Sequence, residues 1–74
     1  MARELINSTK VSENVRIQTY TISFAEPFDD VIVESLYEGQ WIYSRGFNSI
    51  SNDYAAKAAR EYAEWLTEQV FVEN

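Results

Sequence analysis

Carboxylates are the reactive side chains that recur in this sequence, at adjacent positions in one segment and at helical spacing in another. Asp29 and Asp30 follow Pro27, and a pair of carboxyl groups can serve as general acid and base or bind Mg²⁺. Adjacent residues at a strand end point in different directions, and a chain of 74 residues leaves little room for a concave pocket. We therefore expect no catalytic residue and no metal site.

The remaining inventory excludes most enzyme chemistry. The chain has no histidine and no cysteine, so it lacks an imidazole base, a thiol nucleophile, disulfides and the usual zinc ligands. Its two glycines, Gly39 and Gly46, are isolated from each other and form no phosphate-binding loop. The sequence therefore predicts a protein that is not an enzyme and that needs no cofactor.

Acidic residues form two clusters, one over residues 26–38 and the other over residues 61–68. The first contains five acids and no base, and the second repeats at i, i+3 and i+7 on one side of a helix. Either could be ordinary solvated surface, because strand charges discourage edge pairing and Lys57 and Arg60 can pair with helix glutamates. The alternative is electrostatic docking on a basic protein, with the expected partner-binding residues Asp29, Asp30, Glu34, Glu38, Glu61, Glu64 and Glu68.

The charge of the whole chain points to the same class of partner. Residues 1–25 carry three basic and two acidic residues, whereas residues 26–74 carry three basic and ten acidic residues. A surface this acidic repels nucleic acid and membranes and attracts basic proteins. The competing explanation is that the net charge of −6 serves solubility alone.

Hydrophobic periodicity indicates the elements that must position these acids. The pattern predicts β-strands over residues 14–24, 31–37 and 41–45, and an amphipathic helix over residues 53–71. Residues 1–13 are expected to form either a short helix or a flexible arm. The fold predicted for the single domain, residues 1–74, is therefore α+β: a three-stranded antiparallel β-meander packed by one C-terminal helix.

Details of these elements are also predicted. Glu38-Gly39-Gln40 should form a tight hairpin in which Gly39 takes a positive φ, and Asp53 should lie in the first helical turn. In the first strand the apolar residues change face, which predicts either a bulge near Gln18–Thr19 or a strand covered on both sides. The apolar stripe expected on the helix is Ala55, Ala58, Ala59, Tyr62, Leu66 and Val70.

Aromatic residues exceed what one helix on one sheet can bury. The chain has two Trp, five Tyr and four Phe, which is 15% of its residues. Tyr and Trp often lie half exposed, and they are also the preferred anchors of protein interfaces. We therefore expect an exposed aromatic anchor for a partner, or a homodimer. The sequence has no apolar run of signal-peptide or membrane-span length, so a cytoplasmic location is expected.

The segment that follows Gly46 resembles the end of a double-stranded RNA-binding domain. That family has a β-meander, a serine cap and a helix with spaced small residues, and here these are Ser51, Ala55, Ala59 and Ala63. The likeness implies topology only. Asn52 and Asp53 stand where the family has paired lysines, and Arg60 replaces a further alanine, which argues against RNA binding.

The profile of the whole chain resembles small phage-encoded inhibitors of bacterial defence systems, of which anti-CRISPR proteins are the best-known group. This likeness rests on size, acidity and the predicted β-meander with one helix, and no motif carries over. It implies stoichiometric inhibition of a nucleic-acid-handling complex in the host cytoplasm, without direct contact to nucleic acid or membrane. Two alternatives remain: a small homo-oligomeric structural domain, and a degenerate nucleic-acid-binding fold in which Arg3, Lys10 and Arg16 gather on one face.

Overall fold

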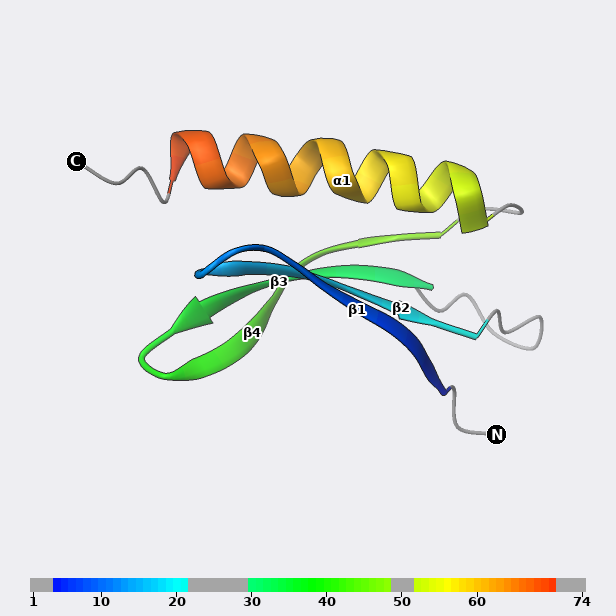
Figure 1. Ribbon diagram of the computed structural model, residues 1–74, viewed down its shortest axis with the longest axis horizontal. Coiled ribbons are helices and arrows are strands. Elements are labelled where there is room, and N and C mark those ends of the chain that lie inside the picture. The colour runs from blue at the N-terminus through cyan, green and yellow to red at the C-terminus, as the bar shows by residue number, and fades with distance from the viewer. Residues whose placement is uncertain (1–3, 22–29, 49–51, 71–74) are drawn as a thin grey trace.

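The protein is a four-stranded antiparallel sheet with one helix lying along one of its faces (Figure 1). The computed structural model describes residues 4–21, 30–48 and 52–70. The α+β class and the C-terminal helix are confirmed, but the predicted number of three strands is wrong. The elements are β1 (Leu5–Ser12), β2 (Val15–Tyr20), β3 (Val31–Tyr37), β4 (Gln40–Phe47) and α1 (Asn52–Gln69), and the sheet order is β1-β2-β3-β4.

The additional strand is β1, in the segment predicted to be a helix or an arm. It pairs antiparallel with β2 from Leu5↔Tyr20 to Ser12↔Val15, so a two-residue turn at Glu13 and Asn14 connects the strands. The sequence LINSTKVS contains Asn, Ser and Thr, which compete with helical hydrogen bonds, and β-branched residues, which favour strands. Pairing with the otherwise open edge of β2 therefore prevails over a helix of one or two turns.

The hairpin between β3 and β4 forms as predicted, with a turn of two residues. Tyr37 pairs with Gln40, and the residues between them have positive φ: 50° at Glu38 and 79° at Gly39. Positive φ at both central positions defines a type I′ turn, whose twist matches that of the flanking strands. Asn-Gly is the favoured pair for this turn, so a glutamate in its first position is unusual.

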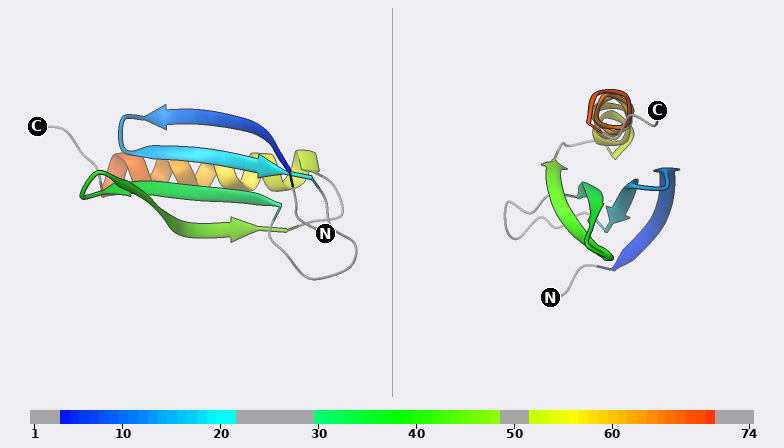
Figure 2. Two further views of the ribbon diagram at one scale, coloured as in Figure 1. Left: turned by 90° about the horizontal axis from the view of Figure 1, so that it is seen from below. Right: turned by 90° about the vertical axis from the view of Figure 1, so that its left-hand side faces the viewer.

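The core lies between α1 and the two inner strands, β2 and β3. Figure 2 shows α1 running behind the strands in the left-hand view and covering one face of the sheet in the end view. Alternate residues of the strands face the helix, and the helix contributes mainly small side chains. The buried apolar residues are Val15, Ile17, Val31, Val33, Ala55, Ala59, Ala63 and Leu66.

The helix stripe differs in part from the predicted one. Ala55, Ala59 and Leu66 are buried as predicted, and Ala63 joins them. Tyr62 is only half-buried and Val70 is exposed. Three alanines let the helix approach the sheet closely, so the larger side chains of α1 are displaced to its flank.

The sheet has no bulge at Gln18–Thr19, where one was predicted. These residues pair in register with Ile32 and Val31, and the pairing of β2 with β3 has no register shift. Register shifts occur instead in the two edge strands. In β4, Ser44 is the extra residue between the pairs Val33↔Arg45 and Glu34↔Tyr43.

Within the part of the chain that the structure describes, no helix has both the length and the apolar character needed to cross a bilayer.

Candidate protein-docking surface

The three helix glutamates lie on the side of α1 that faces away from the sheet. Glu61, Glu64 and Glu68 are all exposed, whereas Ala59 and Ala63 on the opposite side are fully buried. The spacing of 3.6 residues per turn explains this separation. We call these three glutamates the acidic ridge. The structure therefore places them opposite the buried stripe of α1.

The last residue of the acidic ridge, Glu68, lies in the last turn of the helix, where negative charge is least favourable. Aligned peptide dipoles give the C-terminus of a helix a partial negative charge, which basic residues usually offset. The last turn of α1 has no basic residue. One ridge residue has an ion-pair partner in the described chain, since Glu64 Oε2 lies 3.7 Å from Arg60 Nε; both side chains are more than half exposed, so the pair contributes little.

Two further glutamates lie at the same end of the molecule. Figure 1 shows that the β1–β2 turn, the β3–β4 turn and the C-terminal end of α1 all lie at its left-hand end. The first turn contains Glu13 and the second contains Glu38, and both residues are exposed. The β1–β2 turn also lies close to the helix, because Thr67 Oγ1 is 3.5 Å from Ser12 Oγ. Glu13 and Glu68 each adjoin one residue of this contact.

Glu13 was not among the predicted partner-binding residues. Sequence reasoning placed it in a helix or an arm, because the β1 strand was not recognised. The signal that could have found it is the Glu13–Asn14 turn between two segments rich in β-branched residues.

The other predicted acidic cluster does not form a common surface. Asp29 lies outside the described residues. The side chain of Asp30 is 1% exposed, and its Oδ1 has no hydrogen-bond partner among the described residues. Its backbone accepts a hydrogen bond from Tyr20 N and donates one to Phe47 O. Asp30 therefore offers no carboxylate to a partner in this structure, which corrects its assignment to a docking surface.

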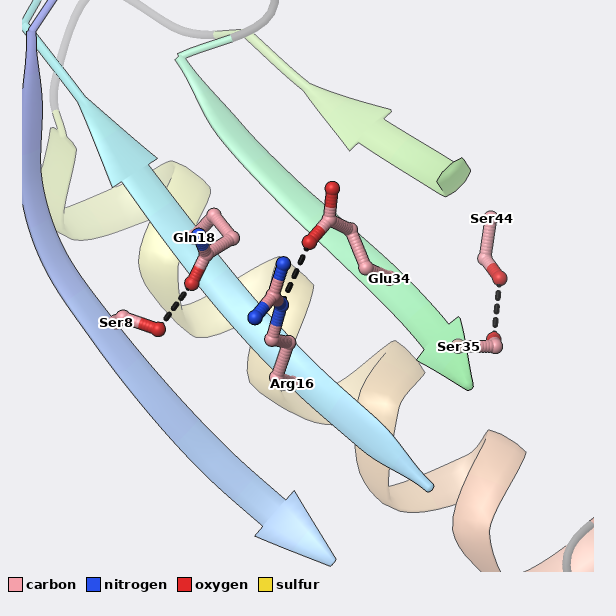
Figure 3. A network of polar contacts seen from close by, with 6 residues as sticks. All are labelled: Ser8, Arg16, Gln18, Glu34, Ser35 and Ser44. Carbon is pink, nitrogen blue, oxygen red and sulfur yellow. Dashed lines mark hydrogen bonds and ion pairs between the residues drawn. The ribbon is translucent and has the colours of Figure 1, made fainter. Parts of the chain in front are cut away.

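Glu34 is engaged within the sheet. Arg16 Nε donates to Glu34 Oε1 at 2.7 Å, and the Arg16 guanidinium carbon lies 4.5 Å from the ring centroid of Trp41. Figure 3 shows this pair on the face of the sheet away from α1, beside the hydrogen bond between Ser8 and Gln18. The strand that carries Glu34, β3, is an inner strand of the sheet. Its charge is therefore matched within the fold.

A row of aromatic rings in contact with one another flanks the acidic ridge on the side of β4. The ring centroid of Phe47 lies 6.1 Å from that of Tyr62, and Tyr62 is stacked on Trp65 with centroids 5.8 Å apart and an interplanar angle of 29°. Arg45 lies over Phe47 and Tyr62, at 5.2 and 5.3 Å from their centroids. The last ring of the row, Trp65, is 52% exposed.

Among the described residues, no group of three or more acidic side chains is placed to hold a metal ion. The exposed carboxylates and aromatic rings instead share one helix surface. Comparison of the chain with protein-family models, with curated proteins and with solved structures found no match.

Proposed function

We propose that this chain is a non-enzymatic binding protein that docks the acidic ridge of α1 on a basic surface of a partner protein. The observation that carries the proposal is the placement of Glu61, Glu64 and Glu68 together on the outer face of α1, with Glu68 in a last turn that has no basic residue. A carboxylate in the last turn of a helix costs about 0.3–1 kcal/mol at the surface. A binding role accounts for keeping a charge at Glu68 that does not favour folding.

The class of partner follows from this charge. A row of carboxylates with a net chain charge of −6 attracts proteins that expose arginine and lysine, and proteins that handle nucleic acid expose such surfaces most often. The specific form of the proposal is stoichiometric inhibition of a nucleic-acid-handling or bacterial defence complex, as anti-CRISPR proteins do. The chain would occupy a basic site that otherwise binds a phosphate backbone.

The test is an affinity capture from bacterial lysate at low and moderate salt, read by mass spectrometry. The wild-type chain is compared with E61Q/E68Q and with the matched control E4Q/D53N. Both variants lose two negative charges, but Glu4 directly precedes β1 and Asp53 lies in the first turn of α1. Figure 1 shows the starts of β1 and α1 at the opposite end of the molecule. We expect a basic protein to be captured by the wild type and the control, and to be lost from the ridge variant and at higher salt. Equal capture by all three chains would contradict the proposal.

Self-association is the second candidate function, and a separate observation favours it. Among the described elements, α1 covers one face of the sheet only, and the other face exposes 59% of Tyr43 and 50% of Leu5. Both edge strands contain register shifts, which discourage pairing between sheets, so a dimer would use this face. Light scattering that gives the monomer mass of 8.6 kDa at high concentration would remove this candidate.

The nucleic-acid-binding alternative required Arg3, Lys10 and Arg16 to gather on one face. Lys10 and Arg16 are direct cross-strand partners and so share a face, whereas Arg3 lies outside the described residues. Arg16 is already paired with Glu34. Retention on heparin at low salt would support this alternative over the other two.

A further inference from the structure

Trp65 occupies a position on α1 that the core does not use. The residues that face the sheet here are Ala63 and Leu66, and successive residues are rotated by about 100° around a helix. Trp65 therefore points to the flank of the helix and leaves 52% of its surface exposed. Exposing half of the largest apolar side chain forgoes burial that would stabilise the fold.

The ring is nevertheless held in place by its neighbours. One face of Trp65 stacks on Tyr62, and Tyr62 in turn packs on Phe47 of β4. Arg45 lies over the rings of Phe47 and Tyr62 and adds a cation to the same row. An exposed aromatic ring that is already fixed loses little conformational entropy when a partner binds, which is the property of an interface anchor.

The chemistry around Trp65 selects the kind of group that would bind it. Glu61 and Glu68 lie four residues before and three residues after Trp65, which are the spacings that bring side chains together on a helix surface. The exposed side of the indole is therefore flanked by a carboxylate on each side along the helix. An aromatic face attracts a cation, and tryptophan attracts it most strongly.

We infer that Trp65 is the anchor of the docking surface, and that it takes an arginine side chain of the partner protein. The guanidinium would stack on the exposed indole face while its N–H groups donate to Glu61 and Glu68. Arginine fits this site better than lysine, because its planar group stacks on an aromatic ring and donates in several directions at once. This inference rests on the proposed function and names the recognition chemistry of the same surface.

A tryptophan fluorescence titration tests the inference without knowledge of the natural partner. The chain has two tryptophans, so W41F leaves Trp65 as the only reporter and retains a ring beneath Arg16. The probes are a nona-arginine and a nona-lysine peptide, added at low salt. We expect nona-arginine to change the Trp65 emission and to bind more tightly than nona-lysine.

Two substitutions of Trp65 separate the cation interaction from apolar contact. Phe retains an aromatic face, whereas Leu retains apolar surface without one. We expect W65L to weaken nona-arginine binding about 3- to 30-fold and W65F to weaken it less, as measured by calorimetry. E61Q/E68Q should also weaken binding, whereas E4Q/D53N should weaken it less. A circular dichroism spectrum like that of the wild type shows that each variant is folded.

The outcomes distinguish this inference from the function on which it rests. Nona-arginine could bind in a salt-sensitive way that E61Q/E68Q abolishes, while W65L leaves the affinity unchanged and the fluorescence emission of Trp65 does not respond. This outcome would overturn the role of Trp65 as anchor, and the acidic docking surface would stand. If neither nona-arginine nor nona-lysine binds the wild-type chain at low salt, both the anchor and the acidic docking surface are overturned. Equal affinity for the two peptides would overturn the preference for arginine.

Discussion

The guanidinium carbon of Arg45 lies 5.3 Å from the ring centroid of Tyr62. The extra residue in β4, Ser44, lets Arg45 face the helix while Tyr43 faces the other side of the sheet. Arg45 pairs with Val33, whose side chain is buried beneath α1, whereas Tyr43 pairs with Glu34 on the other face. Without the bulge at Ser44, strand alternation would put Arg45 and Tyr43 on the same face. The irregularity of an edge strand therefore connects β4 to the aromatic row.

This contact predicts energetic coupling between Arg45 and Tyr62. In a double-mutant cycle with R45A and Y62L, we expect a coupling free energy of about 0.5–1 kcal/mol, which is the range for an exposed cation–π pair. The measurement is urea unfolding of the wild type, the two single variants and the double variant. Strictly additive losses would show that the two residues do not interact in solution.

Removing negative charge from the acidic ridge is expected to weaken partner binding and to stabilise the fold. We expect E68K to raise the free energy of unfolding by about 0.3–1 kcal/mol, because it replaces an unfavourable charge at the helix C-terminus with a favourable one. D53K makes the same change of charge in the first turn, where Asp53 is favourable, and should lower stability by a similar amount. Thermal unfolding at low salt measures both. A loss of stability in E68K would indicate that Glu68 has a structural role.

The type I′ turn predicts a second stabilising substitution. Glu38 has a φ of 50°, a conformation that costs a residue with a β-carbon about 1 kcal/mol and that asparagine tolerates well. We therefore expect E38N to increase the free energy of unfolding by up to about 1 kcal/mol, measured in urea. The exposed Q40N variant introduces the same residue after the turn and serves as the control. An E38N chain no more stable than the wild type would argue against a type I′ turn in solution.

The alanine stripe predicts that the helix–sheet interface has no room for larger side chains. Ala59 is 0% exposed and packs in the buried cluster with Val15, Val33 and Leu66. We expect A59L to lower the free energy of unfolding by about 1–3 kcal/mol, because the helix must move away from the sheet. E61L, on the outer face, should change it by less than about 0.5 kcal/mol. Similar effects of the two substitutions would mean that the interface is loosely packed.

The β1 strand predicts that the first residues of the chain are required for folding. Deletion of residues 1–12 would turn β2 into an edge strand and would remove Val11, which packs against the core. We expect the shortened chain to lose its circular dichroism signal or to aggregate. A monomer with the spectrum of the full chain would instead restore the view of this segment as an arm.

The sequence predicted the elements whose signals are local. Gly39 indicated the β3–β4 hairpin, Asp53 indicated the start of α1, and the spacing of Ala55, Ala59 and Leu66 indicated its buried face. Each of these signals acts within one turn or a few turns of chain, where sequence spacing translates directly into position.

Features that depend on tertiary pairing were missed. Leu5–Ser12 has no strong alternation of its own and becomes a strand by pairing with β2. Asp30 is polar and lies in an acidic segment, so its burial could not be inferred from its type. Glu34 was assigned to a docking surface because its pairing with Arg16 joins two strands that are 18 residues apart in the sequence.

The buried alanine stripe and the acidic ridge have no residue in common, although they belong to the same 18-residue helix. Substitutions of Glu61, Glu64 or Glu68 therefore leave the core packing of α1 in place. Under the proposed docking function, a lineage that carries this chain could change its target by successive substitutions on the outer face and keep a folded protein at each step. The division of one helix into two faces would then let the binding surface change while the core stays the same.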